Sequence, residues 1–346
     1  MDLFLDDTFP YGSVLLDWQC HDRKRLGNHG GAKGESMNSS AMKLGPIGVW
    51  TSQFDYQPAA KAQAAAAELE QLGFGAIWFP ESVGREALTN AALLLGATNR
   101  TVIATGIANI YARDPVTTAA AQNTLAEAYP GRFLLGLGVS HVPLVEQIRG
   151  HSYGKPVASM RAYLDGMDRA PYRAVPPSVK PVRVLAALGP KMLQLAGERA
   201  DGAHPYFVPP QHTARARGIL GGDKLLAVEQ AVVLETDSAK AREIARSHTS
   251  RYLKLPNYVN NLRRLGFAAE DLVDGGSDNL VDAIVAWGDM TAVIDRVRAH
   301  QSAGADHVCI QVLPADPQAL PITQWREIGA ALLGDVAKSN KAKASS

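Results

Sequence analysis

Two side chains suited to acid–base chemistry stand directly after short apolar runs. His141 follows the run 133–139, where an imidazole can take up or release a proton near neutral pH. Its alternative role is a loop histidine that only hydrogen-bonds the backbone. Glu81 follows the run 76–79 and precedes Ser82. Its carboxylate either accepts hydrogen bonds from backbone and ligand groups or pairs with a basic residue as scaffold, because a buried carboxylate needs such partners.

A second pattern is typical of anion binding. Leu188 and Gly189 end an apolar run, and Pro190 and Lys191 open a helical segment. Glycine lets the backbone approach a ligand, and proline starts a helix whose free N–H groups suit a phosphate. The alternative is an ordinary turn between a strand and a helix. Three further residues end apolar runs and are candidate substrate contacts together with Ser82, namely Trp50, His204 and Tyr206.

Several familiar motifs are incomplete here. Gly136 and Gly138 resemble the start of a dinucleotide fingerprint, but His141 stands where the third glycine belongs. Ser140 lies in a sequence similar to a nucleophile elbow, yet Val142 replaces the final glycine. No group of His, Asp and Glu has the spacing of metal ligands, so we expect a mechanism without a metal ion.

The elements that position these residues repeat in a regular order. From Lys43 onward, β-branched apolar runs alternate with alanine-rich segments that begin at Pro58, Pro115 and Pro190. Continuous apolar runs are typical of strands buried on both faces. We therefore predict an α/β fold, a single (β/α)8 TIM barrel, with a two-domain doubly wound protein as the alternative. The predicted strands are 46–51, 76–79, 102–108, 133–139, 182–187, 202–207, 228–235 and 307–313.

Three segments do not fit the repeat. Residues 255–278 form an insertion after the seventh strand, either a lid or binding loop, or an elaboration of the outer wall or a dimer contact. Residues 1–41 have no apolar period and are predicted to be a disordered extension or a leader before a start at Met37 or Met42, the alternative being an arm over the active site. The barrel spans 42–335, and 336–346 is predicted to be a disordered tail.

Composition narrows the possible partners. The 346 residues carry 35 Lys and Arg against 34 Asp and Glu, and 46% are apolar, which argues against disorder and against nucleic acid as a partner. No run approaches the ~20 apolar residues that cross a membrane. The acidic start and the two cysteines, Cys20 and Cys309, predict a cytoplasmic protein. We expect a small-molecule substrate and a homodimer.

Six short motifs resemble the luciferase-like monooxygenase superfamily, most closely its branch that uses the deazaflavin coenzyme F420. They are IWFPE (77–81), IATGIAN (103–109), RDP (113–115), YPGRFLLGLG (129–138), ADG (200–202) and AGADH (303–307). The similarity covers residues 42 to about 333. It implies the same barrel, with the cofactor at the C-terminal ends of the strands.

The resemblance also implies roles for individual residues. Gly106 and Ile107 match a non-prolyl cis peptide that braces the cofactor ring, Asn109 lies along the cofactor, and Glu81 matches an acidic residue near the ring. The cofactor phosphate lies on the backbone at Leu188 and Gly189. Arg113, Lys155 and Lys191 are basic residues available to the oligoglutamate tail of F420.

The sequence also departs from the branch. A glucose-6-phosphate dehydrogenase of this branch has a histidine where Ser82 stands and a catalytic glutamate where His141 stands, and residues 204–210 lack its lysine. Glucose 6-phosphate is therefore not the expected substrate. The resemblance implies an F420-dependent oxidoreductase with His141 as the catalytic acid or base. The alternatives are a two-component monooxygenase that uses FMN and a non-catalytic flavin- or deazaflavin-binding protein.

Overall fold

Eight parallel strands close into a barrel in the computed structural model, which describes residues 42–344, with side chains to residue 334. The barrel closes because β10 pairs with both β1 and β8. The predicted (β/α)8 barrel is thus confirmed, and an open doubly wound sheet is excluded. The strands are β1 (Ile47–Trp50), β2 (Ala76–Phe79), β3 (Val102–Thr105), β5 (Phe133–Gly138), β6 (Val182–Leu185), β7 (Gly202–Ala203), β8 (Leu225–Val233) and β10 (His307–Val312).

The predicted strand over 102–108 is interrupted by a bulge. Ala104 pairs with Leu134, but Ala108 in β4 (Ala108–Asn109) pairs with Leu137, so one side of the ladder has one residue more than the other. The extra residue falls at Gly106 and Ile107, whose peptide bond is cis. Such bulges re-aim side chains and are frequent beside active sites. A further short strand, β9 (Ala286–Trp287), pairs with β8 and was not predicted.

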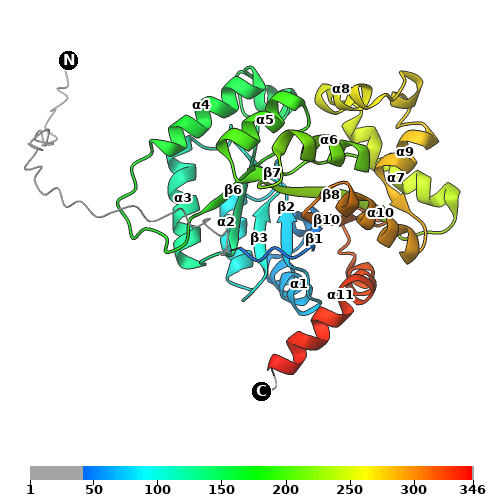
Figure 1. The fold of residues 1–346 in the computed structure, drawn as a ribbon, viewed down its shortest axis with the longest axis horizontal. Coiled ribbons are helices and arrows are strands. Elements are labelled where there is room, and N and C mark those ends of the chain that lie inside the picture. Colours follow the sequence, from blue (N-terminus) through cyan, green and yellow to red (C-terminus); the bar gives the residue numbers. More distant parts are fainter. Residues whose placement is uncertain (1–41, 345–346) are drawn as a thin grey trace, which may run out of the picture. The chain divides into compact units, whose positions relative to one another are not determined.

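Helices surround the strands (Figure 1). Two of the three prolines that the sequence places at helix starts are the first residues of their helices, α3 (Pro115–Ala128) and α5 (Pro190–Arg199). The third, Pro58, is the N-cap of α1 (Ala59–Gln71). The remaining helices of this outer layer are α2 (Ala87–Leu95), α4 (Pro156–Asp168), α6 (Pro210–Leu220), α10 (Met290–Ser302) and α11 (Ile322–Ala344).

Alternation along each strand divides the core in two. Side chains such as Ile77 and Leu135 point outward and pack against the helices. Trp78, Leu134 and Cys309 point inward and fill the barrel, as in other barrels of this kind. Side chains therefore fill the barrel interior, and the C-terminal ends of the strands are left to form a site.

The insertion over 255–278 lies with α7 (Ser238–Tyr252) and α9 (Asp278–Ile284) at one side of the barrel (Figure 1). Arg242 of α7 forms ion pairs with Asp278 and Asp282, which fix α7 to α9. Helix α8 (Pro256–Leu265) brings the ring of Tyr258 to 5.7 Å from that of His141. Part of the insertion therefore covers the C-terminal end of the barrel, as a lid or binding loop would.

The two ends of the chain differ in what the structure describes. Helix α11 continues to Ala344, where the sequence predicted a tail without structure from residue 336. Alanine and lysine, which are strong helix formers, dominate this stretch and explain the difference. The predicted extension over 1–41 lies outside the described residues, as do 345–346. Within the described part, no helix combines the length and the apolar character needed to span a bilayer.

Candidate active site

The bulge after β3 is held by the end of β2. The Gly106 N–H donates to Phe79 O at 2.7 Å, and the Glu81 N–H donates to Ile107 O at 3.2 Å. Two glycines of β5 make room for it, since a side chain on Gly136 would collide with Thr105 O and one on Gly138 with the Ile107 side chain. The Gly-Leu-Gly motif, incomplete as a dinucleotide fingerprint, thus accommodates the bulge.

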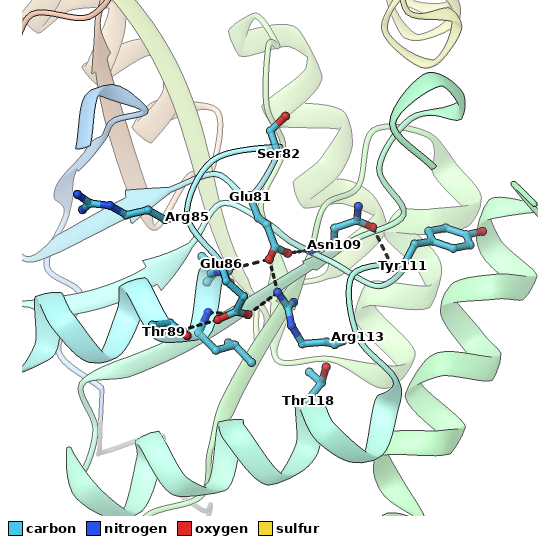
Figure 2. Close-up of polar contacts among 12 residues, drawn as sticks. Glu81, Ser82, Arg85, Glu86, Thr89, Asn109, Tyr111, Arg113 and Thr118 are labelled. Atoms are coloured by element: carbon cyan, nitrogen blue, oxygen red, sulfur yellow. Dashed lines mark hydrogen bonds and ion pairs between the residues drawn. The ribbon is translucent and has the colours of Figure 1, made fainter. Parts of the chain in front are cut away.

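Glu81 is bonded to protein groups on both carboxylate oxygens (Figure 2). One oxygen accepts from the Asn109 N–H at 2.7 Å, and the other from the Ala87 N–H at 3.1 Å and from Arg113. The Glu81 side chain is 3% exposed. The structure therefore supports the scaffold role for Glu81, which positions the backbone of Asn109, rather than direct contact with a ligand.

Arg113 is enclosed between two carboxylates, Glu81 and Glu86 (Figure 2). Burial alone lowers the pKa of its guanidinium, but the hydrogen bond to Glu81 and both negative charges outweigh burial and raise the pKa. The side chain is 8% exposed, and its Nη2 is bonded to both carboxylates. A buried pair of this kind fixes loops in place.

Trp50 and His204 face the bulge from inside the barrel. A Cβ placed on Gly106 would lie 2.6 Å from Trp50 Nε1 and 3.1 Å from His204 Nε2. Both nitrogens are buried and have no hydrogen-bond partner in the described structure. Residue 106 must therefore be glycine, because any side chain there would collide with Trp50.

The His204 ring is held rigidly. Its Nδ1 lies 2.9 Å from Ala227 O, and its face stacks on Trp78 at a centroid distance of 4.4 Å. Trp78 in turn donates to His307 Nε2 at 3.1 Å, so His307 has a structural role in the barrel interior. Burial lowers the pKa of His204 to about 4, so the imidazole is neutral at pH 7.

An aromatic cluster lies next to these residues. Tyr206 lies 5.0 Å from Trp50 between ring centroids, and its hydroxyl bonds Tyr252 at 2.7 Å and Gln311 at 2.8 Å. Phe207 follows in a left-handed conformation with φ of 60°, and its N–H donates to Glu229 at 3.0 Å. Sequence reasoning identified Tyr206 but missed Glu229, which sits inside an apolar run.

His141 lies at the end of β5, below α8. Burial lowers its pKa, and a hydrogen bond with the Asn257 side chain offsets only part of this effect. The preceding residue, Ser140, has φ of 57° and turns the chain sharply. A neutral imidazole that is half-buried under Tyr258 can accept a proton. Tyr258 and Asn257 were missed because their partner is more than a hundred residues away in sequence.

The start of α5 is a basic site. Gly189 is its N-cap and no side chain caps the helix, and a Cβ on Gly189 would lie 3.6 Å from Arg264 Nη1. Leu188 O accepts a hydrogen bond from His212 Nε2 at 2.8 Å, which orients the turn. Lys191 is exposed in the first turn. Pro190 has no N–H, and Met192 N–H already donates to Gly189 O at 3.1 Å, so the positive charge of Arg264 and Lys191 and the positive end of the helix are what suit a phosphate here. Arg264 lies in the insertion, where no local pattern identified it.

Ser82 lies apart from the Trp50 and His204 pair in the contacts that the structure shows. Its side chain points away from Glu81 (Figure 2), and its carbonyl accepts from Arg149 at 3.1 Å. It lines a cavity of about 510 Å³ with Tyr111 and Arg149. Among the described residues, no three His, Cys, Asp or Glu side chains are grouped as metal ligands.

The fold is that of the (β/α)8-barrel class, in which functional groups lie at the C-terminal ends of the strands. Here the bulge, His141 and the start of α5 meet that description. The chain belongs to the luciferase-like monooxygenase family, whose model matches residues 37–307.

Individual relatives agree with this assignment. A Mycobacterium tuberculosis protein named as a coenzyme F420-dependent oxidoreductase is 32% identical over 203 residues, which cover 50% of this chain and 57% of that protein. An F420-dependent secondary alcohol dehydrogenase, solved with an F420-acetone adduct, superposes with a TM-score of 0.67 at 16% identity over 84% of this chain and 98% of its own.

A third likeness is the oxygenating constituent of 3,6-diketocamphane monooxygenase from Pseudomonas putida, solved with FMN. Its TM-score is 0.62 at 15% identity, over 82% of this chain and 95% of its own. At such identities the two solved structures establish the fold alone.

Proposed function

We propose that this protein is an F420-dependent oxidoreductase that transfers a hydride between a small organic substrate and C5 of the deazaflavin. The observation that carries the proposal is the start of α5 at Gly189, which no side chain caps and which Arg264 borders, at the same end of the barrel as the bulge at Gly106. The family membership and the relative named for F420 support the same cofactor. The bound deazaflavin would supply the carbon that gives or takes the hydride.

The chain's own residues would orient the ligands and move the proton. Gly189, the first turn of α5 and Arg264 hold the cofactor phosphate, with Lys191 close by in the same turn. His141, neutral at pH 7, accepts the proton that leaves a substrate hydroxyl during oxidation and returns it during reduction. Tyr258 lies against His141 and covers part of its ring.

A two-component monooxygenase that uses FMN is the second candidate. The likeness to the FMN-bound oxygenating constituent favours it, and FMN also has a phosphate that Arg264 can bind. A non-catalytic cofactor-binding protein is supported less, because such a protein has no need of a proton acceptor like His141 at the barrel mouth.

Titration of the purified protein with F420 and with FMN, each oxidised and reduced, separates these candidates. We expect F420 to bind more tightly, followed by turnover in a substrate screen with the tighter cofactor. Tight binding of FMN without affinity for F420 would show that the leading proposal is wrong.

Arg264→Ala tests the phosphate site. We expect the Kd for F420 to rise about tenfold, the effect of losing one charge-assisted contact at an exposed position. Arg263→Ala is the matched control, because Arg263 is the neighbouring exposed residue of α8. An equal effect of both changes would indicate general electrostatic attraction instead of a site at Gly189.

His141→Ala tests the proton transfer. We expect turnover to fall by about 100-fold or more while the Kd for F420 changes little, since general acid–base groups contribute on that order. Unchanged turnover would show that His141 only supports the loop.

A further inference from the structure

A cavity of about 510 Å³ opens among three loops at the C-terminal end of the barrel. The loops follow β2, β4 and β5, and the first of them is bonded to the bulge through the Glu81 N–H and Ile107 O. The phosphate site proposed at Gly189 follows β6 instead, so the cavity is a separate feature. Its volume is in the range that binds small molecules.

The carboxylates in the cavity wall are already bonded to protein groups (Figure 2). Glu81 accepts from two backbone N–H groups and from Arg113. Glu86 caps α2 by accepting from the N–H groups of Leu88 and Thr89, and it also pairs with Arg113. Because both acids are occupied in this way, the wall does not offer them to a cation.

Arg149 is the charged group of the cavity that keeps unused donors. One of its N–H groups donates to Ser82 O at 3.1 Å, and it forms no ion pair among the side chains that the structure describes. Arg85 lines the same cavity, but it donates to Gln57 O and its charge acts on Asp55. Since a guanidinium binds a carboxylate through two parallel N–H groups, Arg149 is placed to take one.

The remaining wall offers rings and apolar side chains. The rings of Tyr111 and His151 lie 6.3 Å apart between centroids, and the Tyr111 hydroxyl accepts from the Gly154 N–H at 3.2 Å, which fixes its ring. Val83 and Ile148 line the rim and are 69% and 62% exposed. Apolar and aromatic groups around a few polar ones are the usual lining of a small-molecule site.

We propose that this cavity binds an organic carboxylate, with the carboxylate on Arg149 and the apolar body against Tyr111, Val83 and Ile148. The site stands on these contacts alone, and only the identity of its natural occupant rests on the proposed function. Two sources can supply such a carboxylate. One is a substrate of the proposed oxidoreductase, and the other is the oligoglutamate tail of F420.

Titration calorimetry of the purified full chain with phenylacetate tests the site, and phenylacetamide is the neutral counterpart of the same shape. We expect phenylacetate to bind at one site with a Kd about tenfold or more below that of phenylacetamide, because charge-assisted hydrogen bonds are the stronger ones. Equal affinities, or no binding of phenylacetate at millimolar concentration, would overturn the proposal.

Arg149→Gln removes the charge and keeps an amide donor. We expect it to raise the Kd for phenylacetate about tenfold and to leave that for phenylacetamide nearly unchanged. Arg169→Gln is the matched control, because Arg169 is an exposed arginine at the C-cap of α4 and does not line the cavity. An equal effect of both changes would mean that positive charge attracts the anion without a site.

Val83→Ser tests the apolar part and decides the question if thermal unfolding shows that Arg149→Gln is not folded. We expect it to weaken phenylacetate and phenylacetamide alike, by about threefold, since the loss is one of apolar contact. Val175→Ser is the matched control, because Val175 is also 69% exposed but lies outside the cavity. If the two variants bind phenylacetate equally well, the cavity is not the site.

F420 and a deazaflavin without the phosphate and the glutamate tail distinguish the two sources. If Arg149→Gln weakens the binding of F420 but not of the tail-less compound, the tail occupies the cavity. If it weakens neither and still weakens phenylacetate, the cavity belongs to a substrate. A wild-type protein that binds phenylacetate but neither F420 nor FMN would contradict the proposed function and leave the carboxylate site in place.

Discussion

Glu229 is a carboxyl group enclosed in the barrel at 1% exposure. One of its oxygens accepts from the Phe207 N–H at 3.0 Å, and the other has no partner in the described structure. Burial raises its pKa to about 8, and the bond from Phe207 opposes this only in part. Glu229 is therefore protonated at neutral pH and holds Phe207 in its left-handed conformation as a neutral acid.

This arrangement predicts that Glu229 makes folding depend on pH. Because its pKa is higher in the folded state than the usual 4.5, its contribution to stability is complete below that value and is lost as the pH rises through about 8. Glu229→Gln keeps the shape and an acceptor for Phe207 but cannot ionise. We expect equal free energies of unfolding at pH 5 and an advantage for Glu229→Gln of about 2 kcal/mol or more at pH 9.

Urea unfolding at the two pH values measures this difference. Glu243→Gln on the exposed side of α7 is the control and should leave the pH dependence of the wild type unchanged. A Glu229→Gln variant that is equally destabilised at both pH values would mean that Glu229 is ionised and bonded in the native protein.

At the scale of elements, the bulge after β3 depends on a glycine in the neighbouring strand. Thr105 and Gly136 exchange two hydrogen bonds through the threonine hydroxyl, at 2.8 and 2.9 Å. A Cβ on Gly136 would strike the backbone oxygen of Thr105, which cannot move without shifting the bulge. The absence of a side chain at Gly136 therefore fixes the position of the bulge at Gly106 and Ile107.

Gly136→Ala should therefore lower the free energy of unfolding by about 2–3 kcal/mol, as overpacking against backbone does. Gly218→Ala is the matched change, since Gly218 is exposed in the last turn of α6 and a Cβ there would meet no other atom. There alanine should stabilise the protein by about 0.5–1 kcal/mol through helix propensity. Equal effects of the two changes in thermal unfolding would show that the bulge tolerates a side chain at residue 136.

The sequence predicts these elements better than it predicts their contacts. Parallel strands buried on both faces appear as continuous apolar runs, so all eight barrel strands were found, whereas the two residues of β9 carry no pattern. Glu81 was identified as a candidate, but the contact that defines its role comes from Arg113, 32 residues later. Arg264 and Tyr258 reach the site only because α8 folds over the barrel, which depends on tertiary packing.

At the scale of the described chain, five histidines are buried, and for four of them burial lowers the pKa far enough to keep the ring neutral at pH 7. Burial lowers the pKa of His204 and His307 to about 4, and of His248 and His300 to about 3. His204 directly follows β7, His307 begins β10, and His248 and His300 lie in α7 and α10, so both the barrel and its outer layer contain such a histidine. Arginine partners lower the pKa values of Asp168 and Asp282 despite burial, so the stability that these two carboxylates contribute is lost at a lower pH than that of the histidines.

No observation on the described chain tests the expected homodimer, which remains a prediction.

These histidines predict steep loss of stability in mild acid. Each binds a proton in the unfolded chain below pH 6.5 but only below about 4 in the folded chain, so stability is lost as the pH falls between these values. With four such groups the free energy of unfolding should fall by up to about 5 kcal/mol per pH unit. Urea unfolding from pH 7 to pH 5 measures the slope of the unfolding free energy against pH.

His248→Phe, inside the aromatic cluster, should reduce this slope by the equivalent of about one bound proton, while His151→Gln at an exposed position should leave the slope unchanged. A slope that His248→Phe does not alter would mean that this histidine is already charged in the folded protein.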